Sequence, residues 1–167
     1  MQRKHSAFLS TIAGMSMLFL AVQPVLALDG KAYPGAACQT RAPESPFLRS
    51  NALQNTGADP ITVFCPIVRD DMLSGVVKSA FVTVIDRHPG KDFICSLSSY
   101  SSTGTLLGYA AAFSSGSPAT PQQLNFANVP SGGANGNQGN YLIECFMPPS
   151  FNGNASSVLS YQVTEEE

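Results

Sequence analysis

Two short apolar runs of this chain each carry a cysteine in the middle of an alternating pattern. Residues 140–149 read Asn-Tyr-Leu-Ile-Glu-Cys-Phe-Met-Pro-Pro, and every second side chain of a strand points to the same face. One face of this run then holds Tyr141, Ile143, Cys145 and Met147. An earlier run places Phe93, Cys95 and Leu97 on one face in the same way. Two such strands predict a sheet with a disulfide at the centre of its buried face.

The chain contains four cysteines, which are Cys38, Cys65, Cys95 and Cys145. An even number in an exported chain predicts two disulfides, and the sequence leaves three pairings open. We expect a Cys95–Cys145 bridge, because both residues lie mid-strand among apolar neighbours. The Cys38–Cys65 bridge that remains would join an N-terminal arm to the first core strand. Zinc is the poorer alternative, since no Cys-x-x-Cys pair is present and one histidine follows residue 27.

Residues 1–27 predict a cleaved signal peptide. Arg3 and Lys4 form a basic start, residues 7–22 are apolar and uncharged, and Ala27 ends a small-residue cleavage pattern. The apolar run is shorter than the ~20 residues that span a bilayer, so we expect no membrane span in the mature chain. The pattern therefore predicts a secreted protein, extracellular or periplasmic, in which residues 28–167 contain one domain.

The mature part predicts an all-β fold. Residues 28–46 are expected to form a loop-like N-terminal arm, because prolines interrupt them, and residues 47–167 the domain itself. About 7–8 short strands separated by turn signals, without a convincing helix, predict an antiparallel β-sandwich. Residues 81–98 are expected to form a hairpin around Pro89-Gly90. Glu165 to Glu167 are expected to be a frayed acidic tail.

Three further segments predict strands. Residues 47–54 indicate one weak strand, and residues 61–68 a better one. Pro66 lies inside the second, so that strand is expected at a sheet edge, at a bulge, or ending at its cysteine. Residues 107–113 indicate a strand with these residues on one face: Leu107, Tyr109, Ala111 and Phe113.

A resemblance follows from the structural residues. The chain has Tyr33-Pro34-Gly35 before its first cysteine, then Cys65-Pro66-Ile67, Cys95, the run Tyr141 to Cys145 with Pro148, and a closing Tyr161. This arrangement resembles a group of uncharacterised exported bacterial proteins and covers most of the mature chain. The resemblance implies secretion, disulfides and a compact β domain. The group has no assigned activity, so the resemblance implies no functional residue.

Hydrolytic chemistry has little support in the sequence. His88, the one histidine after residue 27, has Asp86 and Asp92 near it along the chain. No Gly-x-Ser-x-Gly elbow is present, and a histidine in a turn is usually solvated. Glu144 is a candidate acid if its strand face is half buried. Its simpler interpretation is a solvent-facing residue or a partner for a nearby arginine, Arg69 or Arg87.

Metal binding is a minor hypothesis. Exported sandwiches often hold calcium through loop carboxylates and carbonyls, and Asp59, Asp70 and Asp71 are the available acids. Asp70 and Asp71 are adjacent, so on an extended chain their side chains point in opposite directions. We assign no catalytic, cofactor-binding or metal-binding residue and expect no cofactor.

Non-catalytic binding is the favoured function. The chain has 9 Lys+Arg against 11 Asp+Glu and a formal net charge of −2, without the basic cluster that nucleic-acid binding requires. The expected partner is a polysaccharide or another cell-surface component. The chain has no tryptophan, so tyrosines would supply the aromatic contacts. The candidates are Tyr100 and Tyr109, with Tyr33 and Tyr161 as further ones, and Tyr100 is expected to be the most exposed.

Two other functions remain open. A surface poor in charge and rich in Ser, Asn and Gly, with an extended N-terminal arm, also suits a structural subunit of an extracellular layer, fibre or matrix. A hydrolase is the third interpretation. The sequence does not determine the oligomeric state.

Overall fold

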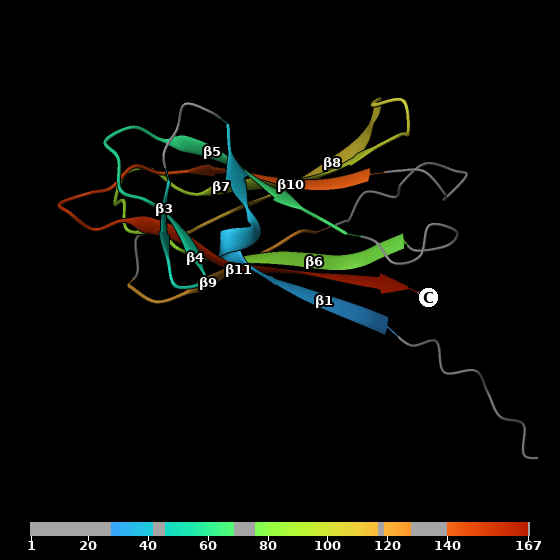
Figure 1. The fold of residues 1–167 in the computed structure, drawn as a ribbon, viewed down its shortest axis with the longest axis horizontal. Coiled ribbons are helices and arrows are strands. Elements are labelled where there is room, and N and C mark those ends of the chain that lie inside the picture. Colours follow the sequence, from blue (N-terminus) through green and yellow to red (C-terminus); the bar gives the residue numbers. More distant parts are fainter. Residues whose placement is uncertain (1–27, 42–45, 69–75, 117–118, 128–139, 167) are drawn as a thin grey trace, which may run out of the picture.

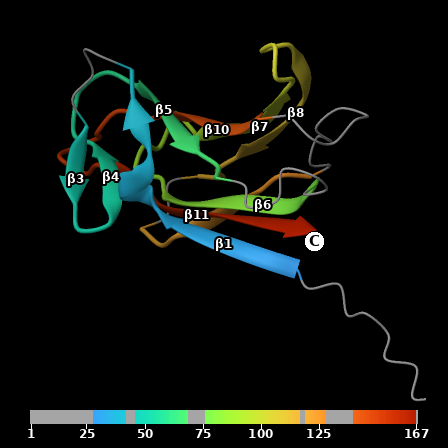
Figure 2. The same cartoon turned by 45° about the vertical axis from the view of Figure 1, so that its right-hand side comes forward.

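The structure, a computed structural model, describes residues 28–41, 46–68, 76–116, 119–127 and 140–166. These residues form two antiparallel sheets that lie face to face, as Figures 1 and 2 show. The protein is therefore the antiparallel β-sandwich that the sequence predicted. The described part of the chain has one short 3₁₀ turn, η1 (Gly35–Ala37), and no helix long and apolar enough to cross a membrane.

The six-stranded sheet has the order β3-β4-β11-β6-β9, and β1 pairs with the later part of β11. Its strands are β1 (Leu28–Pro34), β3 (Phe47–Arg49), β4 (Ala52–Asn55), β6 (Val76–Ile85), β9 (Gln122–Asn125) and β11 (Ser156–Glu166). The five-stranded sheet has the order β2-β5-β10-β7-β8. Its strands are β2 (Gln39–Thr40), β5 (Ile61–Pro66), β7 (Ile94–Tyr100), β8 (Leu106–Phe113) and β10 (Asn140–Met147). The weak strand expected over residues 47–54 is two strands, β3 and β4, which form a hairpin.

The core lies between the sheets, and β10 is the middle strand of its sheet. Its buried residues are the predicted ones: Tyr141, Ile143, Cys145 and Met147. Cys145 lies directly opposite Cys95 of β7, and a disulfide joins them at the centre of the sheet. The second disulfide joins Cys38 to Cys65 and so ties the segment before β2 to β5. Both bridges have the expected pairing.

The hairpin expected over residues 81–98 is wrong. β6 pairs with β11 and β9 in the six-stranded sheet, whereas β7 pairs with β10 and β8 in the other sheet. Residues 86–93 therefore cross between the sheets instead of turning back along β6. Among the described strands, β3–β4 and β7–β8 are the consecutive strands that pair with each other. Strand alternation is the same in a hairpin and in a crossing, so it does not distinguish them.

A buried carboxylate organises this crossing. Asp86 is 0% exposed, and its Oδ1 accepts a hydrogen bond from the backbone N–H of His88 at 2.9 Å. Its Oδ2 accepts hydrogen bonds from Ser114 Oγ at 2.6 Å and from the backbone N–H of Phe93 at 3.3 Å. The same N–H also donates to Ser114 Oγ at 2.8 Å. Since a buried charge needs hydrogen bonds in place of water, Asp86 fixes the path from β6 to β7.

The loop-like arm expected over residues 28–46 is wrong for its first part, because Leu28–Pro34 pairs with β11 along its whole length. η1 then turns the chain toward the other sheet. A Cβ on Gly35 would lie 2.0 Å from the backbone oxygen of Val158. Only glycine fits this close approach of two backbone segments.

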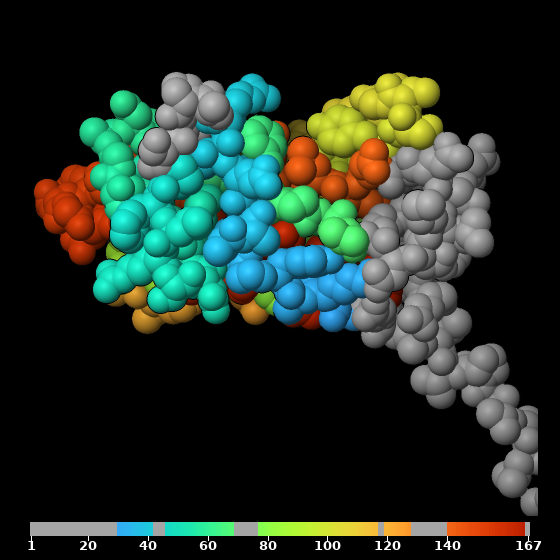
Figure 3. Space-filling view, viewed as in Figure 1, coloured from blue at the N-terminus to red at the C-terminus, as the bar shows by residue number. Residues whose placement is uncertain are grey.

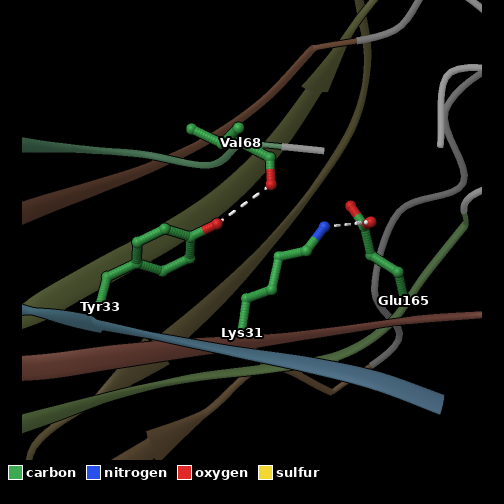
Figure 4. Close-up of polar contacts among 4 residues, drawn as sticks. All are labelled: Lys31, Tyr33, Val68 and Glu165. Carbon is green, nitrogen blue, oxygen red and sulfur yellow. Dashed lines mark hydrogen bonds and ion pairs between the residues drawn. The ribbon is translucent and has the colours of Figure 1, made fainter. Parts of the chain in front are cut away.

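The frayed tail expected at the C-terminus is also wrong at Glu165. This residue lies in β11 and is 3% exposed. Its carboxylate forms an ion pair with Lys31 Nζ of β1 at 2.9 Å, which Figure 4 shows. Glu165 is thus a buried strand residue whose charge is paired on the neighbouring strand. The alternation of apolar and polar residues does not reveal this pairing.

Pro66 lies at an edge, one of the positions expected for it. The neighbouring strand β2 pairs with β5 at Val63 and Phe64 and reaches no further. Pro66 is the last residue of β5 and has β10 as its one neighbouring strand, so the proline stands where the ladder with β2 has ended. The predicted signal peptide and residues 69–75, with Asp70 and Asp71, lie outside the described residues.

Candidate functional site

β8 has its larger side chains on the solvent side of the five-stranded sheet. Ala110 and Ala112 are its buried residues, whereas Tyr109 and Phe113 are 68% and 60% exposed. A strand with one face in the core usually buries its large apolar side chains and exposes polar ones. The reversed pattern indicates that the outward face of this sheet makes contacts of its own. Figure 3 shows the β7–β8 hairpin, in yellow, projecting from the body of the molecule.

The strand register extends this exposed apolar surface across three strands. Phe113 of β8 lies opposite Ile94 of β7, which lies opposite Phe146 of β10. Ile94 is 43% exposed and Phe146 is 38% exposed. We call these three residues the apolar row. Because neighbouring strands are about 4.8 Å apart, the row spans roughly 10 Å across the strand direction.

A polar row lies beside the apolar row, two residues along the same face. Glu144 of β10 lies opposite Ser96 of β7, and we call these two residues the polar row. Ser96 lies opposite Ala111 of β8, so short side chains occupy the middle of the face. Glu144 is half-buried and forms no hydrogen bond or ion pair with another described residue, Arg87 included. Its carboxylate is available to a ligand.

The far side of the polar row is bordered by an aromatic ring and a guanidinium group. Phe64 of β5 lies opposite Glu144 and is half-buried. The guanidinium carbon of Arg41 lies 5.4 Å from the centre of the Phe64 ring, within the range of a cation–π contact. Arg41 is therefore held over Phe64, while β7, β8 and β10 contain no lysine or arginine.

The two tyrosines proposed as ligand contacts share this outward face. Tyr109 lies opposite Ser98, and Tyr100 is two residues further along β7. Tyr100 ends β7 rather than lying in a loop, and it is half-buried. The expectation that Tyr100 is the most exposed tyrosine is therefore wrong, because Tyr109 has 68% of its surface exposed.

His88 does not form a relay with the acid and the hydroxyl nearest to it. Its Nδ1 accepts a hydrogen bond from the backbone N–H of Gly90 at 3.1 Å, and its ring packs edge-on against Phe151. Ser114 Oγ donates directly to Asp86 rather than through the imidazole. A nucleophilic triad needs the imidazole between the hydroxyl and the carboxylate. Asp86, His88 and Ser114 therefore do not form a nucleophilic triad, and their hydrogen bonds hold the backbone between β6 and β7 in place.

The described residues also contain no group of three or more His, Cys, Asp or Glu side chains that could hold a metal ion. Asp59 is exposed in the turn before β5, and its backbone oxygen accepts a hydrogen bond from Asn55 Nδ2 at 2.8 Å. Asp70 and Asp71 lie outside the described part of the chain, so the calcium hypothesis stays a prediction there.

Tyr33 and Tyr161 have structural partners. Their rings stack with centroids 4.8 Å apart across β1 and β11. Tyr33 donates its hydroxyl to the backbone oxygen of Val68 at 3.0 Å, as Figure 4 shows, and Tyr161 donates to that of Pro66 at 2.7 Å. Burial raises the pKa of Tyr161 to about 12, and the nearby Tyr33 hydroxyl adds to the rise. The two hydroxyls thus connect the six-stranded sheet to Pro66 at the end of β5 and to Val68 just beyond it.

Sequence reasoning missed the apolar row as a possible contact surface. A signal was present, because the run 107–113 is apolar on both faces of the strand. One face alternates between leucine, tyrosine, alanine and phenylalanine, and the other holds Ala110 and Ala112. A strand with two apolar faces indicates either burial on both sides or a functional outer face. The tertiary structure decides between them, because only one face of β8 packs against the other sheet.

The fold and the site define a disulfide-linked β-sandwich with an apolar row and a polar row on one outward sheet face. No family model and no curated protein sequence matches the chain. A family two carbohydrate esterase from Cellvibrio japonicus has a similar fold, with a TM-score of 0.51 at 8% identity. The match covers 84% of this chain and 36% of the esterase, so this chain spans well under half of that protein's length.

Two further solved structures have weaker likeness. The CBM36-1 domain of a multidomain xylanase from the hindgut metagenome of Trinervitermes trinervoides has a TM-score of 0.47 at 14% identity, covering 81% of this chain and 96% of that domain. A carbohydrate-binding module CBM36 in complex with calcium and xylotriose has a TM-score of 0.47 at 12% identity. The match covers 80% of this chain and 98% of that module. The likeness to the esterase concerns the fold alone, and we draw nothing from the two weaker ones.

Proposed function

We propose that this chain is a secreted, non-catalytic binding module that holds a polysaccharide on the outward face of its five-stranded sheet. The observation that supports this most is the exposure of Tyr109 and Phe113 beside serine hydroxyls and the carboxylate of Glu144. Sugar rings have apolar C–H faces and a rim of hydroxyl groups. Such ligands suit sites that combine apolar area with a few placed polar groups.

Secretion is supported by the predicted signal peptide and by the two disulfides. Cystines persist in oxidising compartments and are rare in the cytosol. Both bridges here lie in the core, where Cys65, Cys95 and Cys145 are 0% exposed. The bridges support a folded module that keeps its shape outside the cell, where polysaccharides are met.

The test is a binding screen of the disulfide-bonded protein against soluble polysaccharides, by affinity electrophoresis and then titration calorimetry. Tyr109→Ala and Phe113→Ala should each weaken binding about fivefold or more, because losing a central aromatic contact costs about 1 kcal/mol or more. Phe47→Ala is the matched control, since Phe47 is 54% exposed on the other sheet. The proposal fails if no polysaccharide binds, or if all three variants bind alike.

A structural subunit is the second candidate, and a specific observation favours it. β3 is an edge strand whose three residues are all exposed, and Phe47 and Leu48 present more than half of their surfaces. Exposed apolar edge strands tend to pair with other chains. Light scattering after size separation would detect a large assembly, and Phe47→Asp should dissolve it if β3 is the joint. A monomer in solution contradicts this second candidate.

A further inference from the structure

We infer that the outward face selects a neutral glycan chain over an acidic one, and that Glu144 is the residue that sets this selection. The inference rests on the proposed function and names the substrate class of the same site. Three observations on the described residues carry it: the two parallel rows, the charge of the face, and the free carboxylate.

The two rows match the two sides of a sugar chain. The apolar row runs across β8, β7 and β10 through Phe113, Ile94 and Phe146. The polar row, Glu144 and Ser96, runs parallel to it at two residues' distance, about 7 Å along the strands. A glycan lying across the strands can place ring C–H faces on the apolar row and its hydroxyl edge on the polar row.

The charge on β7, β8 and β10 disfavours an acidic group at the polar row, although Arg41 borders that row over Phe64. β7, β8 and β10 carry no lysine or arginine, and Glu144 is their one acidic residue. A uronate carboxylate or a sulfate on the polar row would approach a like charge without a basic partner on these strands. Like charges brought together at an interface disfavour that partner. A neutral hydroxyl instead donates a charge-assisted hydrogen bond to the carboxylate.

The carboxylate of Glu144 can also accept such a bond. It is half-buried between Phe64 and Ser96, its cross-strand neighbours, and forms no hydrogen bond or ion pair with another described residue. A ligand hydroxyl that donates to this carboxylate has to displace only water, because no described side chain occupies the carboxylate. The Arg41 guanidinium lies over the Phe64 ring, beyond the polar row.

The test compares the neutral polysaccharide that binds best in the screen with its own carboxymethylated derivative. Backbone and linkage are then identical, and a hydroxyethyl derivative of equal substitution serves as the neutral chain, so that the two compared chains differ chiefly in charge. The wild type should bind the neutral chain about tenfold more tightly, a difference of about 1.4 kcal/mol. Glu144→Gln should bring the two affinities together, because it removes the repulsion of the acidic chain and keeps an acceptor oxygen. Neutral binding should weaken about fivefold, since the charge-assisted hydrogen bond becomes a neutral one. Asp59→Asn, an exposed acid off this face, should change neither affinity.

Equal wild-type affinity for both chains overturns the inference, as does a preference that Glu144→Gln leaves unchanged. In either case neutral binding that still depends on Tyr109 and Phe113 leaves the proposed function standing. Binding of neither chain overturns both. Far-UV circular dichroism of Glu144→Gln before titration confirms that any lost binding reflects the site rather than unfolding.

Discussion

Replacing Asp86 tests whether one buried carboxylate holds the crossing between the two sheets. Asp86→Ala removes the acceptor for the His88 N–H, for Ser114 Oγ and for the longer of the two hydrogen bonds from the Phe93 N–H. The Phe93 N–H keeps Ser114 Oγ as its acceptor at 2.8 Å. The variant thus leaves one backbone N–H and one hydroxyl without their partner.

The magnitude follows from these bonds. A hydrogen bond to a charged group contributes about 1.5–3 kcal/mol to stability, so losing two should cost roughly 3–5 kcal/mol. Ser114→Ala should cost only about 1–2 kcal/mol, because the Phe93 N–H can still donate to Asp86. His88→Ala should cost less than about 1 kcal/mol, since Asp86 accepts from the backbone of His88 and not from its imidazole.

Urea unfolding followed by far-UV circular dichroism, with the disulfides intact, measures these free energies. Ser115→Ala, an exposed neighbour of Ser114, is the matched control and should unfold like the wild type within about 0.5 kcal/mol. A loss below about 1 kcal/mol in Asp86→Ala would refute the reasoning, because a buried acceptor with three donors cannot be removed so cheaply. Equal losses in Asp86→Ala and His88→Ala would refute it too, since the side chain of His88 would then share the role.

Two further predictions concern the contacts that η1 and β11 make. Gly35→Ala should destabilise the fold by about 1–3 kcal/mol or more, because its Cβ would lie 2.0 Å from the Val158 oxygen. Thermal unfolding measures this loss, with Gly30→Ala as the control, since the atom nearest to a Cβ there is 3.4 Å away. An equal loss of stability in Gly30→Ala would contradict the prediction. The raised pKa of Tyr161 means that the folded state favours the protonated hydroxyl, so stability is complete below pH 10 and falls as pH rises toward 12. Urea unfolding across this range should show a smaller fall in Tyr161→Phe, and identical curves would be evidence against the assignment.

The sequence predicted the local features of the fold well, because they depend on short-range physics. Alternation of apolar residues identified β10 and its buried face, since a strand places every second side chain on one side. Mid-strand cysteines among apolar neighbours predicted the Cys95–Cys145 bridge, and Cys38–Cys65 followed as the pair that remained. The end of β5 at Pro66 agrees with the missing N–H of proline.

The candidate site was only partly predictable. Tyr109 was named from its residue type, and its exposure followed only from which face of β8 packs against the other sheet. The apolar row joins three strands that are distant in sequence, so no local pattern contains it. Glu144 was recognised as a residue on the outward face of its strand, but its lack of a partner depends on which side chains the neighbouring strands place beside it.

Period-two alternation by itself determined β10 and its apolar face, and the apolar surroundings of Cys95 and Cys145 favoured their bridge among the three pairings that the sequence leaves open. The tertiary structure alone decided which strands pair. The segment 81–98 alternates equally well in a hairpin and in a crossing, and the hydrogen bonds of buried Asp86 select the crossing. It also decided which face of β8 meets water, since both faces are apolar and only packing against the other sheet buries one of them.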